Sequence, residues 1–233
     1  MRGMEKNSCT SCTGERRTKS IAEYDLVLVD MDGTLYYQRP LQLTMGVRML
    51  LNAVSAKEGV SELLTVLRFR KMREKVMGQQ DVDGTLYQGL ALRQKMSEEQ
   101  VEQIIQKWIY RLPLDHIPRF RDEILFRLVG ELEASKTPVV IWSDYPTEEK
   151  QKVLGLAGIP GCYNGGDEIA ALKPSPAGIF YLMEKYGVED AKQVLVIGDR
   201  LSKDGKAAKT AETDFIILKK HPWQRKRQYK KLL

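Results

Sequence analysis

Residues 24–35 read YDLVLVDMDGTL, an apolar run that ends in two aspartates and a glycine. Consecutive aliphatic residues of this kind are typical of a strand that is buried on both faces of a parallel sheet. Ligands of such sheets bind in the crevice beyond the carboxyl ends of the strands. The stretch therefore predicts a central strand of an α/β domain, with Asp30 and Asp32 at its functional end.

The same hexapeptide pattern occurs a second time, as DVDGTL over residues 81–86. This copy follows KVMGQQ (residues 75–80), which is too polar and too interrupted by glycine to be a central strand. We therefore assign the chemistry to Asp30 and Asp32. The copy that begins at Asp81 is interpreted as a turn between helices, in which Gly84 provides the bend.

From residue 118 onward, helical and strand patterns alternate along the chain. Strands are predicted over 138–141, 193–197 and 214–218, and helices over 122–136, 147–158, 176–186 and around 202–210. This alternation predicts βαβ units, and hence a doubly wound parallel sheet of the Rossmann-like α/β class.

Residues 36–117 interrupt this alternation. Their patterns are helical over 44–55, 61–77 and 97–110, and the last segment opens with SEEQ, which has the form of a capping box. A helical block that follows the first strand directly would cover the end of that strand. We therefore expect a core formed by residues 21–35 and 118–220, with a helical cap over 36–117.

The positive charge of the chain is concentrated at its C-terminal end. The formal net charge is +6, but seven cations and no acids lie between Lys219 and Lys231. The rest of the chain is close to neutral, so nucleic acid is not expected as a partner. We expect residues 221–233, including Trp223 and Tyr229, to be a basic tail that is frayed and solvated.

The N-terminal residues 1–20 lack the apolar core of a signal peptide, and no apolar run reaches the roughly 20 residues that span a bilayer. We expect a disordered lead over 1–20, a cytoplasmic protein and no membrane partner. Cys9 and Cys12 form a CxxC, and Cys162 is the third cysteine. Zinc needs four ligands and no second pair is present, so a structural metal is not expected there.

Polar residues also follow the later strands: Ser143 follows one, Asp199 and Asp204 follow another, and Lys173 lies in the loop between them. In order and spacing, DMDGTL (30–35), Ser143, KPSP (173–176) and GDRLSKD (198–204) resemble the four motifs of the haloacid dehalogenase superfamily. The resemblance covers roughly residues 24–219, and the helical insertion resembles that superfamily's cap. It implies a Mg²⁺-dependent phosphatase that hydrolyses a small phosphorylated metabolite through an aspartyl phosphate.

The resemblance gives each residue a role that its chemistry fits. Asp30 would be the nucleophile, because a carboxylate is already ionised at pH 7. Asp32, two residues along the same side of an extended chain, would be the general acid and base. Ser143 and Lys173 would act in catalysis by binding the phosphoryl group. Gly33 and Thr34 would let the backbone turn closely beneath it. The expected Mg²⁺ ligands are Asp30, Asp199, Asp204 and the backbone carbonyl of Asp32.

Several alternatives stay open at this point. Arg200 and Lys203 would either contact substrate or be solvated, and the same holds for four arginines of the insertion: Arg39, Arg68, Arg70 and Arg93. A phosphomutase of the β-phosphoglucomutase type would share every core residue. A hydrolytic dehalogenase would not need Asp32, because halide leaves without a proton. A non-enzymatic module that binds a partner through the basic tail is disfavoured by the complete set of acidic residues.

Overall fold

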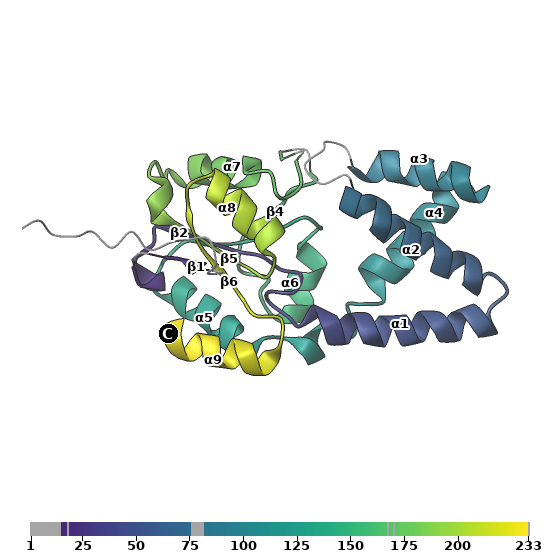
Figure 1. Cartoon of the computed structure of the whole chain (residues 1–233), viewed down its shortest axis with the longest axis horizontal. Coiled ribbons are helices and arrows are strands. Elements are labelled where there is room, and N and C mark those ends of the chain that lie inside the picture. Colours follow the sequence, from purple (N-terminus) through teal and green to yellow (C-terminus); the bar gives the residue numbers. More distant parts are fainter. Residues whose placement is uncertain (1–14, 18, 76–81, 167, 170, 233) are drawn as a thin grey trace, which may run out of the picture.

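The computed structural model describes residues 15–17, 19–75, 82–166, 168–169 and 171–232. In this part of the chain, six strands form one sheet in the order β1-β6-β5-β2-β3-β4 (Figure 1). The strands are β1 (Glu15–Arg16), β2 (Leu26–Val29), β3 (Val139–Ser143), β4 (Gly161–Tyr163), β5 (Val194–Gly198) and β6 (Asp214–Ile217). Strands β2 to β6 are parallel, and β1 pairs antiparallel with β6.

Helices cover both faces of the sheet. Figure 1 shows α5 (Glu123–Ala134) and α9 (Pro222–Leu232) on one side, and α7 (Ala177–Tyr186) and α8 (Lys206–Thr210) on the other. The side chains of β2 alternate between two buried clusters. Val27 and Val29 pack with the α5 side, whereas Leu26 and Leu28 pack with the α7 and α8 side. The prediction of a doubly wound parallel sheet is therefore confirmed.

Residues 36–117 contain α1 (Gln38–Ser55), α2 (Gly59–Lys75), α3 (Val82–Gln94) and α4 (Glu98–Ile105), and α4 continues into a π-helical segment, Gln106–Arg111. We refer to this block as the cap. Figure 1 places it beside the sheet, next to α6 (Glu148–Leu154). No helix among the described residues has both the length and the apolar character that crossing a membrane requires.

The turn predicted at the second hexapeptide is wrong, because residues 82–86 belong to α3; Asp81 lies outside the described residues. Leu86 and Leu90 lie one helical turn apart, and they are 2% and 0% exposed. Each glycine inside a helix costs about 1 kcal/mol relative to alanine, but each fully buried leucine contributes about 2 kcal/mol. Burial of this apolar stripe outweighs the glycines, including Gly84.

The frayed tail predicted for residues 221–233 is also wrong. Arg225 and Tyr229 are four residues apart on one face of α9 and only 1% and 4% exposed, while Trp223 is 61% exposed. The number of charges in this segment gave no sign of the buried face that Arg225 and Tyr229 form. The predicted disordered lead needs a correction as well, since Glu15–Arg16 form β1. Cys9 and Cys12 lie outside the described residues.

Candidate active site

The site lies where the direction of the sheet's connections changes. From β2 the chain continues to β3 and β4 on one side, and it returns to β5 and β6 on the other. Such a switch point is where open α/β sheets bind ligands. A pocket of about 220 Å³ lies there. Its lining includes six residues predicted from the sequence: Asp30, Asp32, Ser143, Lys173, Asp199 and Asp204.

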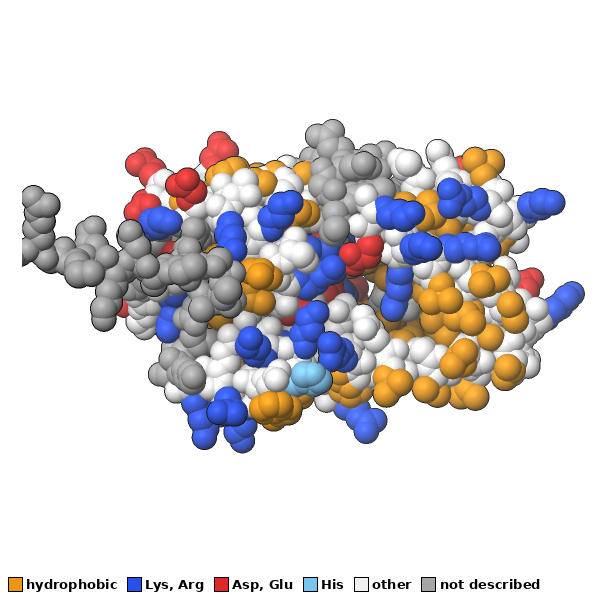
Figure 2. Space-filling view, viewed as in Figure 1, with side chains coloured by type: hydrophobic (Ala, Val, Ile, Leu, Met, Phe, Trp, Pro, Cys, Tyr) orange, Lys and Arg blue, Asp and Glu red, His pale blue; other side chains and the backbone are white. Residues whose placement is uncertain are grey.

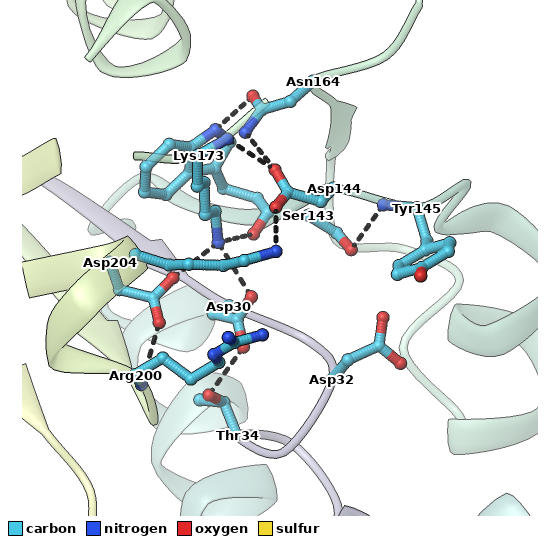
Figure 3. Close-up of polar contacts among 12 residues, drawn as sticks. Asp30, Asp32, Thr34, Ser143, Asp144, Tyr145, Asn164, Lys173, Arg200 and Asp204 are labelled. Atoms are coloured by element: carbon cyan, nitrogen blue, oxygen red, sulfur yellow. Dashed lines mark hydrogen bonds and ion pairs between the residues drawn. The ribbon is translucent and has the colours of Figure 1, made fainter. Parts of the chain in front are cut away.

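Lys173 joins three of the strand ends (Figure 3). Its Nζ donates hydrogen bonds to Asp30 Oδ1 at 2.8 Å, Asp204 Oδ1 at 2.8 Å and the Trp142 carbonyl at 2.9 Å. Burial alone would lower the pKa of Lys173, but the carboxylates of Asp204 and Asp30 outweigh it and raise that pKa. Lys173 is therefore a permanent cation whose three donors are all used.

Asp30 is held at both oxygens. Its Oδ2 accepts a hydrogen bond from the Thr34 hydroxyl at 2.8 Å, while Lys173 holds Oδ1. Burial raises the pKa of Asp30 to about 8 in spite of Lys173, and the charges of Asp204 and Asp199 add to the increase. One lysine thus does not balance this group of carboxylates. Contrary to the expectation from the sequence, Lys173 alone does not keep Asp30 ionised at pH 7, and a divalent cation beside it would favour the carboxylate form.

The carboxylates of Asp30, Asp199 and Asp204 fit a hard divalent cation. One oxygen from each lies within 4.8 Å of the others. Among the described residues, Asp199 Oδ1 is buried without a hydrogen-bond partner. Burial raises the pKa of Asp199 to about 6, and the neighbouring Asp204 contributes to that increase. An all-oxygen donor set with surplus negative charge is the environment that Mg²⁺ prefers.

Two glycines allow these carboxylates to approach the backbone. Gly33 has a φ of +96°, and a Cβ added there would lie 2.5 Å from Asp199 Oδ2. A Cβ on Gly198 would lie 2.4 Å from the Asp204 Cγ. Neither Gly33 nor Thr34 is among the residues that line the pocket. In the described structure they support Asp30 and Asp199, and their predicted contact with the phosphate stays a prediction.

Asp32 forms an ion pair with Lys150 that its position in the sequence does not predict. Lys150 Nζ, from α6, donates to both of its oxygens, at 2.6 and 2.8 Å, and the Tyr36 hydroxyl donates to Oδ1. Burial would raise the pKa of Asp32, but the charge and hydrogen bonds of Lys150 outweigh it and lower that pKa. Asp32 is therefore ionised in the resting site.

The C-terminal end of α2 contacts the core on two sides of the pocket. Arg73, which is 4% exposed, donates to the Asp144 carbonyl at 2.6 Å, and its guanidinium lies 4.2 Å from the centre of the Tyr145 ring. Glu74 pairs with both terminal nitrogens of Arg200, at 2.9 and 3.1 Å. The cap thus contacts the core beside the pocket, through hydrogen bonds and ion pairs that the sequence alone did not predict.

The remaining basic residues separate into two groups. Arg200, Lys203 and Arg70 line the pocket, and Lys203 Nζ lies 3.1 Å from Asp144 Oδ2. The other three arginines considered from the sequence are exposed and do not line it: Arg39, Arg68 and Arg93. Arg39 instead contacts His221 at 3.3 Å. Of the four cap arginines considered from the sequence, Arg70 is positioned to meet a ligand.

Arg225 ties the C-terminal helix to the loop that carries the first motif. Its guanidinium donates to the carbonyls of Gly33 at 2.7 Å and Thr34 at 2.9 Å, and to Asp122 Oδ2 at 3.0 Å. Asp122 in turn accepts hydrogen bonds from the first turn of α5. A residue of the predicted frayed tail therefore stabilises the backbone beside Asp30 and Asp32.

We expect Arg225→Ala to lower the free energy of unfolding by about 3 kcal/mol. The change removes the cation that pairs with the buried carboxylate of Asp122, which keeps only neutral donors, and the donor of the Gly33 and Thr34 carbonyls. Urea denaturation of the full chain measures this change. Arg227→Ala is the matched control, since Arg227 is exposed on the same helix and should change stability by about 0.5 kcal/mol or less. Equal stability of the two variants would contradict the role of Arg225.

Comparison with known proteins matches most of the chain to one protein family and to a curated phosphatase. Residues 24–212 match the family model of haloacid dehalogenase-like hydrolases. A phosphoglycolate phosphatase of Haemophilus influenzae is 28% identical over 182 residues, which cover 76% of this chain and 78% of the relative.

Two solved structures share the fold at 16% identity. The HAD-hydrolase YfnB of Bacillus subtilis, bound to magnesium, has a TM-score of 0.61, with 90% of this chain and 99% of that chain covered. A 2-haloacid dehalogenase of Pseudomonas syringae has a TM-score of 0.58, with 83% and 85% covered. Because the family model spans most of the sequence and the four motif segments meet in one pocket, the chain belongs to the haloacid dehalogenase-like hydrolases.

Proposed function

We propose that this hydrolase is a Mg²⁺-dependent phosphatase of small phosphorylated metabolites, which acts through an aspartyl phosphate on Asp30. The observation that carries the proposal is the presence of two differently held carboxylates in one small pocket. Asp30 is bound by Lys173, whereas Asp32 is bound by Lys150 and Tyr36. The names of the curated relatives support phosphate ester hydrolysis, and phosphoglycolate is the first substrate to test.

In the first step, an oxygen of Asp30 attacks phosphorus while the bond from phosphorus to the leaving oxygen breaks. Lys173 and Ser143 bind the transferring group. Asp32, which is ionised in the resting site, takes up a proton from solvent when the substrate binds and gives this proton to the leaving alkoxide. The ion pair with Lys150 opposes protonation of Asp32, and the negative charge that develops on the leaving oxygen favours transfer of the proton.

In the second step, Asp32 accepts a proton from water while the water oxygen attacks phosphorus. The bond to Asp30 breaks, so inorganic phosphate and the free carboxylate are restored. Lys150 lowers the pKa of Asp32 and so keeps this carboxylate ionised and able to accept the proton. Asp30, Asp199 and Asp204, with the backbone carbonyl of Asp32, would hold the Mg²⁺ that offsets the charge of the phosphate.

Two related reactions compete with this proposal. A dehalogenase needs the first aspartate but no proton donor for its leaving halide, and the placement of Asp32 in the pocket disfavours it. A phosphomutase would use the same residues and return the phosphoryl group to a sugar. Phosphorus NMR of the products distinguishes the mutase from the phosphatase, because a mutase yields an isomeric sugar phosphate with little free phosphate.

Chelation of divalent cations should stop turnover of phosphoglycolate or of p-nitrophenyl phosphate, and Mg²⁺ should restore it. Ca²⁺ should support less activity, because its longer and looser coordination misplaces the in-line attack. Mg²⁺ should also raise the melting temperature, since it relieves the repulsion among the carboxylates.

Asp199→Asn provides the control for the melting-temperature measurement. This variant should remain folded but lose most of the rise in melting temperature that Mg²⁺ causes. Full activity in excess chelator would refute the metal requirement.

A further inference from the structure

The cap carries an exposed apolar surface on α1 and α2, which Figure 2 shows as a cluster of hydrophobic side chains over these two helices. We call it the apolar cap face. Its members are large aliphatic residues with exposed fractions of 41% (Leu64) to 84% (Val54). They are Leu43, Val47, Leu50, Leu51 and Val54 on α1, and Val60, Leu64 and Leu67 on α2.

The spacing of these residues shows that the surface is a second stripe on each helix. Leu43, Val47, Leu50 and Val54 follow one another at intervals of three or four residues, and so do the members on α2. The buried positions of α1 form a separate stripe: Leu41, Met45 and Met49. One apolar side of α1 thus packs inside the chain, and the other is at least half exposed in the described structure.

The size of the apolar cap face exceeds what a monomer normally exposes. With these exposed fractions, the eight side chains present on the order of 800 Å², about what each partner contributes to a standard stable interface. The largest contiguous patch on a typical soluble monomer is roughly 300–600 Å². The surface therefore has the area of one side of a stable protein interface.

We propose that a second copy of this chain covers the apolar cap face, so that the two α1–α2 pairs form a four-helix interface around a twofold axis. The area of the face carries this choice of partner, because a twofold axis brings two copies of the same apolar surface together and covers both at once.

The proposed interface leaves the pocket open. The cap residues that line the pocket are a different set: Tyr36, Gln38, Leu41, Gln42, Met45, Arg70, Arg73, Glu74, Ile109 and Pro113. If the chain dimerises through the apolar cap face, substitutions there should abolish dimerisation without loss of the hydrolase activity. Association and catalysis are then separately measurable.

The test is the molar mass of the full chain in solution, measured by light scattering after size exclusion. We expect twice the chain mass of 26.6 kDa for the wild type. The double variant Leu51→Glu, Val54→Glu should be a monomer, because carboxylates buried at the interface should weaken association by at least about 100-fold. Both side chains are more than half exposed, so the variant should fold, which circular dichroism checks.

Phe180→Glu is the matched control, since Phe180 is a large apolar residue, 49% exposed, on α7 of the core. It should remain dimeric. A monomeric wild type at micromolar concentration would overturn the proposal, and so would a double variant that stays dimeric. Monomeric protein that co-sediments with anionic phospholipid vesicles would assign the face to a lipid surface and would equally overturn it.

Discussion

Asp30→Asn should lower turnover by about 10⁴-fold or more, because the amide cannot serve as the nucleophile and the loss of such a residue disables the whole reaction. The side chain keeps its shape, and Lys173 retains Asp204 and the Trp142 carbonyl as acceptors. The variant should therefore fold with little change in melting temperature. Steady-state kinetics on the best substrate of a phosphorylated-metabolite screen measures the effect.

Asp81→Asn is the matched control for that variant, since Asp81 opens the second copy of the same hexapeptide. It should retain most of the turnover, because that copy continues into a cap helix rather than following a strand of the sheet. A comparable loss in Asp81→Asn would show that the chemistry had been assigned to the wrong copy.

Asp32→Asn should lower turnover of an alkyl phosphate by about 10²- to 10⁴-fold, since asparagine can neither donate nor accept the proton. The leaving group provides a sharper readout. Nitrophenolate leaves without a proton, so the formation of the phosphoenzyme from p-nitrophenyl phosphate should suffer less than its formation from an alkyl phosphate. Rapid-quench measurement of the first turnover compares the two substrates.

The wild-type enzyme should release phosphate in proportion to the substrate consumed. An equal penalty for both leaving groups would exclude Asp32 as the acid. Isomerisation that greatly exceeds phosphate release would replace the phosphatase with a phosphomutase, in which the nucleophile would remain the same.

The central part of the fold was predictable because its strands are apolar on both faces and each ends in a polar motif. The elements that were missed lack such a signal. Strand β4 has three residues, and its central Cys162 is the buried one. Helix α9 reads as a run of cations, although Arg225 and Tyr229 share its buried face. Composition records how many charges a segment carries, and not the direction in which each one points.

The same limit applies to the site. The carboxylates were predicted because they follow strands, and parallel strands bring their ends together. Lys173 was predicted from its motif, KPSP (173–176), which lies in a loop. Lys150 and Arg73 come from helices, where the face that meets the pocket depends on packing. Lys150 reaches Asp32, whereas Lys152, two residues later, pairs with Glu148 and Glu149 at the surface. The sequence contains both lysines without distinguishing them.

Covalent trapping of the phosphoenzyme is the sharpest test of Asp30 as the nucleophile. Asp32→Asn should accumulate the phosphoenzyme with p-nitrophenyl phosphate, because the variant forms it faster than it hydrolyses it. Acid quenching followed by proteolysis and mass spectrometry then locates the phosphoryl group. We predict it on the peptide that contains Asp30, and its disappearance when Asp30→Asn is added. Phosphate release with no phosphorylated peptide, or with the phosphoryl group on another residue, would contradict the account.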